Sequence, residues 1–216
     1  GELIGLARDF RYKRMRCTIH APFTDMDLGS QDVRVISLAR TRLLRILEIS
    51  DVLRPEVIVI HSGYDPGIKK TAFKQWWSTA SKSIEIIAKT AHRFELNLAV
   101  ENVNDTNPAF LRKVIEQYAR FKVGVCLDIG HINMFSEVEV HQWIKELGGS
   151  LLEIHLHDNT GKKDAHLPLG QGTVDFESFF SALEQHEPAP CYTIENTSTD
   201  DVEKSLSFLR SPARKR

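Results

Sequence analysis

The stretch Val123-Gly-Val-Cys-Leu-Asp-Ile-Gly-His131 sets the pattern for the whole chain. It is a short apolar run that ends in the acidic residue Asp128, and His131 follows three positions later. A run of this length, bounded by polar and glycine-containing segments, predicts a buried strand. The D-x-x-H spacing lets the side chains of Asp128 and His131 reach one site where the strand turns into its loop.

Other short apolar runs in the chain also end in His, Asp or Glu. They are Arg16–His20, Glu56–His61, Asn97–Glu101, Leu151–His155 and Cys191–Glu195. Because Asp and Glu total 29 residues and His 9 of the 216, this many such endings by chance would be rare. Metal-binding side chains gathered at the ends of buried strands are the better explanation.

The segments between these strands have helical periodicity, so strand and helix alternate along the chain. The predicted helices cover residues 31–53, 71–94, 107–120, 136–148, 175–187 and 199–210. This alternation predicts parallel β/α units in a single domain over residues 1–216. An open doubly wound sheet would gather its site at one switch point, whereas a candidate ligand ends every strand here, which favours an α/β fold of the TIM barrel type.

A TIM barrel has eight strands, and the sequence offers six. Residues 1–15 are typical of the end of a helix and a connection rather than of a strand. The sequence therefore predicts a TIM (β/α) barrel whose first two strands are absent from this chain.

Charge and cysteine content limit the partners and the compartment. The net charge of −1 and the pI of about 6.8 give no general attraction to nucleic acid or to an anionic membrane. The chain has an odd number of cysteines, Cys17, Cys126 and Cys191, and none of them is part of a C-x-x-C motif. This usage is expected of a protein in a reducing compartment. Without a membrane-spanning apolar stretch or an apolar N-terminal signal, the sequence predicts a soluble, cytoplasmic protein that does not bind a membrane.

Short motifs add a resemblance to a known superfamily. They are IHAPF at 19–23, IHSG at 60–63, VEN at 100–102, CLDIGH at 126–131, IHLHDN at 154–159, DAHLPLGQG at 164–172 and TIEN at 193–196. With these segments in this order, the chain resembles the xylose isomerase-like TIM-barrel superfamily from about His20 to Glu195. That superfamily includes endonuclease IV, of apurinic endonuclease family 2, and many sugar isomerases and epimerases.

The resemblance implies one of two ligand sets. Sugar isomerases and epimerases of this kind hold one metal ion with four ligands, which correspond here to Glu101, Asp128, His155 and Glu195. Endonuclease IV holds three zinc ions with nine ligands, which correspond to His20, His61, Glu101, Asp128, His131, His155, Asp164, His166 and Glu195. Each of the nine positions carries the required residue type.

These sets imply different reactions. The favoured one is hydrolysis of a phosphoester at a multi-zinc site, where one ion generates hydroxide and the others neutralise phosphoryl charge, with Glu101 bridging metals. The alternative is a sugar or sugar-phosphate isomerase or epimerase with one Zn²⁺, Mn²⁺ or Mg²⁺, in which Glu101 and Glu195 move protons. A metal-holding scaffold without catalytic activity is a third reading.

Zinc, in up to three ions, is the favoured metal, because it accepts both His nitrogen and carboxylate oxygen. The expected substrate is a small sugar or phosphorylated molecule. Damaged DNA is less favoured, since DNA binding needs a basic surface.

Four further residues are candidates for substrate binding. His157 lies two positions after His155 and therefore on the same side of the strand, where it either contacts substrate, supports a ligand or is structural. Phe23 and Tyr64 each follow a ligand histidine, in the strand-end loops that form the site of this architecture. They either contact the substrate or pack within their loops. Lys162 either neutralises a phosphate or is an ordinary loop charge.

Glycines and aromatic residues give weaker signals. Gly170 and Gly172 lack the strand-to-helix setting of a dinucleotide site, so a tight turn is the preferred reading. Trp76 and Trp77 resemble a stacking platform, but helix packing is favoured for both.

Overall fold

The structure, a computed structural model, describes residues 1–185 and 189–211. Its residues divide into two units. The first comprises Gly1–Glu101 and Val114–Gly124, and the second comprises Asn102–Lys113 and Val125–Arg216. Strands and helices alternate along the chain, as the sequence predicts.

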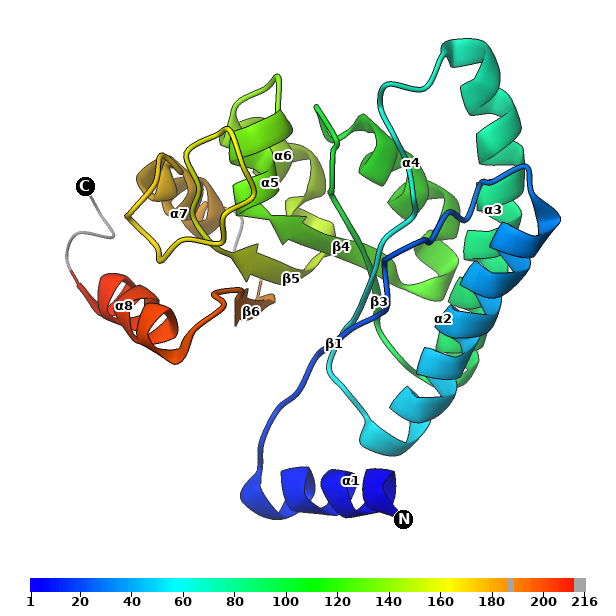
Figure 1. Cartoon of the computed structure of the whole chain (residues 1–216), viewed down its shortest axis with the longest axis horizontal. Helices are drawn as coiled ribbons and strands as arrows, with labels where there is room; N and C mark the ends of the chain where they lie inside the picture. Colours follow the sequence, from blue (N-terminus) through cyan, green and yellow to red (C-terminus); the bar gives the residue numbers. More distant parts are fainter. Residues whose placement is uncertain (186–188, 212–216) are drawn as a thin grey trace. The chain divides into compact units, whose positions relative to one another are not determined.

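The first unit contains a parallel set of short strands. They are β1 (Ile19–His20), β2 (Ile58–Ile60) and β3 (Leu98–Glu101). In this register Ile58 of β2 lies beside Ile19 on one side and Leu98 on the other. The connecting helices are α2 (Val33–Leu53) and α3 (Lys70–Arg93), which contact each other (Figure 1). Because the strands are parallel and in register, their carboxyl ends fall at one edge of the set.

Helix α2 shows how the sequence determines these connections. The Asp32 carboxylate accepts a hydrogen bond from the Arg34 backbone N–H and so caps the first turn. Ala39, Leu43 and Leu47 recur every four residues and are buried on one face. The helix ends at Leu53, because the next residue, Arg54, has a left-handed φ of 54° that is incompatible with a further helical turn.

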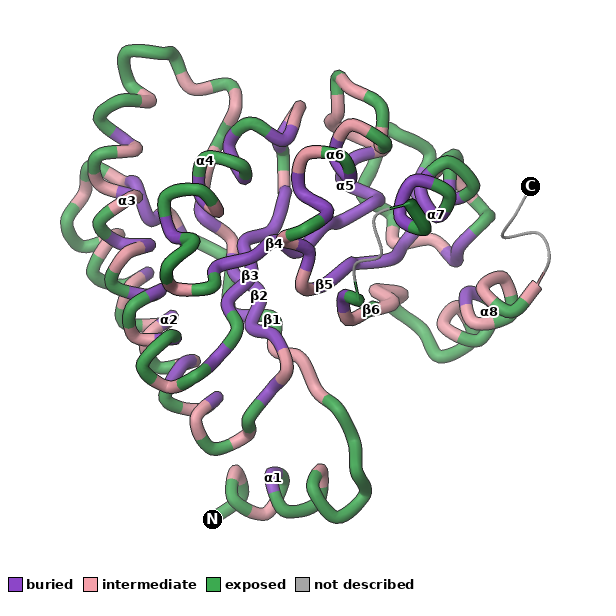
Figure 2. The backbone as a smooth tube through the Cα atoms, turned by 180° about the vertical axis from the view of Figure 1, so that it is seen from behind, coloured by how far each residue is buried: buried purple, intermediate pink, exposed green. Residues whose placement is uncertain are grey.

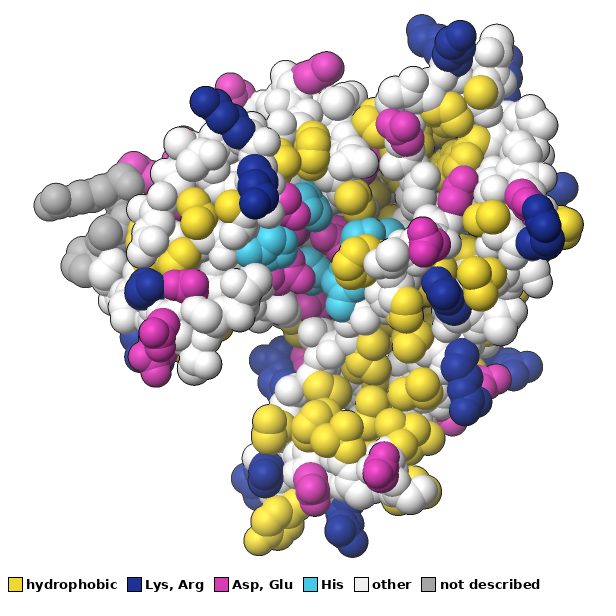
Figure 3. All heavy atoms as spheres, in the orientation of Figure 1, with side chains coloured by type: hydrophobic (Ala, Val, Ile, Leu, Met, Phe, Trp, Pro, Cys, Tyr) yellow, Lys and Arg dark blue, Asp and Glu magenta, His cyan; other side chains and the backbone are white. Residues whose placement is uncertain are grey.

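Helix α1 (Glu2–Lys13) precedes β1 and contacts α2. Its apolar side chains are largely exposed: Ile4 is 64% exposed and Tyr12 is 87% exposed, whereas Ala7 is buried. Figure 3 shows hydrophobic side chains on the surface in the region of α1. Residues 1–15 are thus mainly helical, as expected.

The second unit contains most of another parallel set of strands. They are β4 (Val123–Asp128), β5 (Leu151–Leu156) and β6 (Cys191–Ile194), of which β4 and β5 are almost wholly buried (Figure 2). In this register His155 of β5 lies beside Asp128 of β4 and Thr193 of β6. The helices are α5 (Ile129–Phe135), α6 (Val140–Leu147), α7 (Phe176–Glu184) and α8 (Thr199–Arg210).

Three short elements complete the chain. They are α4 (Ala109–Tyr118) and the 3₁₀ turns η1 (Ala119–Phe121) and η2 (Gly148–Ser150).

The predicted strands are all present, and the largest departure concerns the helix expected over 136–148. Within that range α6 occupies Val140–Leu147, and an additional helix, α5 (Ile129–Phe135), precedes it and begins directly after β4 instead of following a loop. The Asp128 carboxylate accepts a hydrogen bond from the His131 backbone N–H at 2.7 Å and starts this helix. The helix expected over 175–187 ends at Glu184, and residues 186 and 187 lie outside the described part of the chain.

The three cysteines lie in strands or close to one. All three cysteines carry thiols outside any disulfide. Cys126 is buried in β4, but Cys17 precedes β1 because that strand begins only at Ile19. Among the described residues, no helix is both long and apolar enough to cross a membrane.

The cap of α7 gives a first prediction about stability. Asp175 accepts from the Ser178 backbone N–H at 2.9 Å, and its hydrogen bonds to Ser178 lower the pKa of its carboxyl group. Asp175→Ala should therefore lower the free energy of unfolding by about 0.5 to 1 kcal/mol, as measured by urea unfolding at pH 7. The pKa of Asp175 is lower in the folded chain than its ordinary value of 3.8. The difference in stability between the parent and Asp175→Ala should therefore shrink as the pH falls below 3.8, and it should vanish below the folded pKa. Asp175→Asn, which keeps an acceptor oxygen, should lose less at pH 7.

Candidate metal centre

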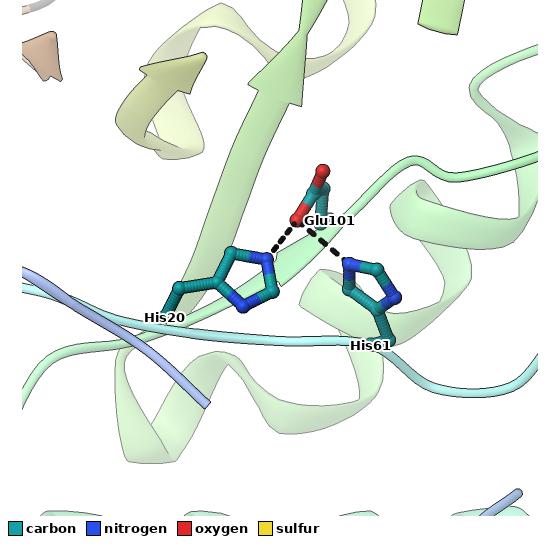
Figure 4. Close-up of side chains that lie close together, drawn as sticks. All are labelled: His20, His61 and Glu101. Carbon is teal, nitrogen blue, oxygen red and sulfur yellow. Dashed lines mark hydrogen bonds and ion pairs between the residues drawn. The ribbon is translucent and has the colours of Figure 1, made fainter. Parts of the chain in front are cut away.

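In the first unit, the strand ends bring together His20, His61 and Glu101 (Figure 4). The Nε2 atoms of His20 and His61 lie 3.1 and 3.0 Å from the same oxygen, Oε2, of Glu101. Glu101 is 3% exposed, so its carboxylate is held away from water between two imidazoles. The structure thus brings these three strand-end residues together.

The hydrogen bond made by Nδ1 of His20 determines whether Nε2 carries a proton or a lone pair in the neutral ring. Nδ1 lies 2.8 Å from the carbonyl oxygen of Ala21, and because a carbonyl only accepts, Nδ1 must donate. In a neutral ring the Nε2 lone pair then faces the Glu101 carboxylate, and two acceptors at that distance repel each other. A proton or a cation between them removes the repulsion, so this triad fits a metal ion.

In the second unit, Asp128, His155 and Glu195 form another group of potential ligands. His155 Nδ1 lies 3.3 Å from Glu195 Oε1 and 3.9 Å from Asp128 Oδ2. Ligand atoms around a tetrahedral zinc ion lie about 3.3 Å apart, given bonds of about 2.0–2.1 Å. One nitrogen and two carboxylate oxygens at this spacing therefore fit a divalent ion with small adjustments.

His131, Asp164 and His166 lie near these residues in the same unit. Both histidines donate from Nδ1 to a backbone carbonyl, His131 to Asn102 at 2.9 Å and His166 to Glu195 at 2.6 Å. Their Nε2 atoms lie 3.5 and 3.2 Å from Asp164 Oδ2, which repeats the arrangement found at His20. The hydrogen bond with His131 is the main cause that lowers the pKa of Asp164 to about 2.

His157 is fully buried, at 0% exposure. Its Nε2 lies 3.0 and 3.2 Å from the two oxygens of Asp128, and its ring stacks on His166 at 4.0 Å. A Cβ atom at Gly130 would lie 2.0 Å from this ring, so glycine is required there. Among the roles expected for His157, this burial favours support of the ligand Asp128 over contact with substrate.

The other predicted contact residues have different surroundings. Phe23 is 54% exposed, and its ring lies 5.3 Å from that of His20 and 5.0 Å from that of His61. Tyr64 instead packs against the Trp76 ring at 5.6 Å, as ordinary loop packing would require. Lys162 is exposed.

The structure also shows residues that the sequence analysis did not single out. Asn102 donates to the Asp128 carbonyl at 2.9 Å and accepts from the Asp128 N–H at 2.8 Å. Glu153 and Asp158 are buried acids that flank the ligand His155 in sequence. An acidic or amide residue within an otherwise apolar strand, or directly after it, is the signal that could have identified them.

Comparison with known proteins places the chain in a family. Residues 3–211 match the family described as xylose isomerase-like TIM barrel. The uncharacterized protein MJ1311 of Methanocaldococcus jannaschii is 26% identical over 207 residues, which cover 93% of this chain and 70% of that protein.

Two solved structures are similar along nearly the whole chain. A D-tagatose 3-epimerase-like protein has a TM-score of 0.84 at 23% identity, and the match covers 96% of this chain and 80% of that one. The TTHB071 protein of Thermus thermophilus, soaked with ZnCl2, has a TM-score of 0.82 at 26% identity with the same coverage. The predicted superfamily and fold class are confirmed, and the chain belongs to the xylose isomerase-like TIM-barrel family.

Proposed function

We propose that this chain is a metal-dependent enzyme that epimerises or isomerises a sugar or a sugar derivative. The observation that carries the proposal is the spacing of Asp128, His155 and Glu195, which suits one divalent ion. The similarity to a D-tagatose 3-epimerase-like protein supports it. Zinc is the preferred ion, because these groups combine imidazole nitrogen with carboxylate oxygen, and Mn²⁺ or Mg²⁺ is compatible.

When bound, the ion polarises a carbonyl or hydroxyl oxygen of the sugar and so acidifies the adjacent C–H. Glu101 and Glu195 are proposed to move protons at the neighbouring carbons. Glu101 has a fixed orientation because His20 and His61 both contact the same carboxylate oxygen. Glu195 is anchored through its backbone, since its carbonyl accepts from His166.

The exposed ring of Phe23 is proposed to contact the substrate. It lines an open hollow of about 610 Å³ together with His20 and Arg42. An aromatic ring beside polar groups can pack against the apolar C–H face of a sugar while the polar groups bind its hydroxyls. Contact of Tyr64 or Lys162 with the substrate remains a prediction.

A second candidate function is hydrolysis of a small phosphoester at a multi-metal site. The specific observation in its favour is the additional ligand groups, one around Glu101 and one around Asp164. A single ion held by the residues around His155 would not use these groups as ligands. Neighbouring ions would neutralise phosphoryl oxygens and the leaving group, which is the usual advantage of several metals.

Metal content and two assays separate these functions. Sugar epimerisation predicts about one metal ion per chain. It also predicts that a substrate C–H hydrogen exchanges for deuterium in D₂O, which NMR can detect on a panel of ketoses. His155→Ala should lose both the ion and the exchange, whereas His141→Ala, at an exposed position of α6, should keep both. About three ions per chain, with cleavage of bis(4-nitrophenyl) phosphate and no sugar exchange, would establish the second candidate instead.

A further inference from the structure

Glu153 occupies an unusual position for an acidic residue. It lies in the middle of β5, is 1% exposed, and is flanked in sequence by Leu152 and Ile154. Side chains two positions apart on a strand point to the same face, so Glu153 and the ligand His155 share a face of β5. An apolar residue would fill such a position at lower energy, because burial of a carboxylate requires compensating partners.

The contacts of Glu153 connect it to the proposed metal ligands. Thr193 of β6 donates a hydrogen bond from Oγ1 to Glu153 Oε1 at 2.5 Å. The same oxygen lies 3.6 Å from His155 Nε2. The other ring nitrogen of His155, Nδ1, lies 3.3 Å from Glu195 Oε1. The imidazole therefore lies between Glu153 on one side and the ligand group on the other.

We propose that Glu153 is a positioning residue that orients His155 for metal binding. Its carboxylate selects the tautomer with the proton on Nε2, and this leaves the Nδ1 lone pair directed at Asp128 and Glu195. The distance of 3.6 Å is about 0.6 Å longer than a typical hydrogen bond, so a small rotation of the ring on metal binding completes the contact. This inference rests on the proposed metal site.

Thr193 has a defined part in this arrangement. Its hydroxyl holds the carboxylate of Glu153 from the neighbouring strand, and in the strand register it lies directly beside His155. A carboxylate that accepts from the second ring nitrogen is one of the common ways in which proteins orient a metal-binding histidine.

The test compares metal affinity with stability of the metal-free chain. Zn²⁺ affinity is measured by competition with a chromophoric chelator, and the melting temperature is measured with excess EDTA. Glu153→Gln should weaken Zn²⁺ binding about 10-fold and Glu153→Leu about 100-fold. The metal-free melting temperature of Glu153→Leu should stay unchanged or rise, because the substitution removes a buried charge.

A matched control lies next to Glu153 on the same strand. Ile154→Val changes packing on the opposite face of β5, so it should lower the melting temperature and leave Zn²⁺ affinity unchanged. The ¹⁵N shifts of His155 provide a readout of the tautomer: the Nε2–H form should dominate in the parent chain and be lost in Glu153→Leu.

Two results would overturn the inference about Glu153 alone, and a third would overturn the proposed metal site with it. Zn²⁺ affinity in Glu153→Leu equal to that of the parent would show that Glu153 does not orient His155. A loss of affinity that only parallels a fall in the metal-free melting temperature would assign Glu153 a purely structural role. A parent chain whose Zn²⁺ binding is insensitive to His155→Ala would overturn the proposed metal site as well, which distinguishes the two failures.

Discussion

Asp158→Asn should lower the free energy of unfolding by about 3 to 5 kcal/mol, measured by urea unfolding of the metal-free chain. Asp158 is 0% exposed and accepts four backbone hydrogen bonds, from the N–H groups of Asn159, Gly170, Gly172 and Val174, at 2.8, 2.9, 2.8 and 3.1 Å. An amide in place of the carboxylate removes the charge and turns an NH₂ group toward these donors. Each buried N–H left without an acceptor adds to the loss.

The same substitution should weaken metal binding in the second unit. The segment closed by Asp158 carries Asp164 and His166, and Asp158 also pairs with Leu167 through two backbone hydrogen bonds. Asp200→Asn, on an exposed acid of α8, is the matched control and should change stability by less than about 0.5 kcal/mol. An Asp158→Asn chain as stable as this control would mean that the four contacts do not hold the segment.

The contacts of Asp158 also explain the structural role of Gly170 and Gly172. Gly170 has a φ of 80°, as the tight turn expected from the sequence requires. At Gly172 a Cβ atom would lie 2.2 Å from the Asn159 carbonyl oxygen, so the close approach of the backbone excludes a side chain. Both N–H groups donate to Asp158, so they are already occupied by a carboxylate of the chain itself.

The strands could be predicted well because their limits are set by local chemistry. The strand β4 runs over 123–128 as expected, since Lys122 before it has a left-handed φ of 56° and its last residue, Asp128, caps a helix. The helix α5 was not predicted, because it has only seven residues and its start depends on the Asp128 side chain. An aspartate at the end of an apolar run has the same sequence signal whether a loop or a helix follows.

The ligand groups could be predicted in part. Parallel strands end at one edge, so His20, His61 and Glu101 could be expected to meet, and they do. Glu153 and Asp158 could not be assigned a role in this way, because their partners depend on strand register and on a loop that folds back.

Gly130→Ala should lower the free energy of unfolding by about 2 to 4 kcal/mol. The added Cβ would lie 2.0 Å from Cε1 of the His157 ring and 2.4 Å from its Nε2. This ring has no room to move, because it is fully buried, contacts both oxygens of Asp128 and stacks on His166. The loss should occur although alanine favours a helix over glycine by about 1 kcal/mol.

A control and a double variant identify the cause of this loss. Gly5→Ala in α1, where a Cβ would meet nothing within 4 Å, should be neutral or stabilising by up to about 1 kcal/mol. In a Gly130→Ala/His157→Ala double variant the clash is absent, so its loss in urea unfolding should be smaller than the sum of the single losses. Additive losses would show that the steric conflict lies elsewhere. A double loss smaller than the sum would establish why the D-x-x-H motif contains glycine. The buried imidazole of His157, which supports Asp128, occupies the space that a side chain would need.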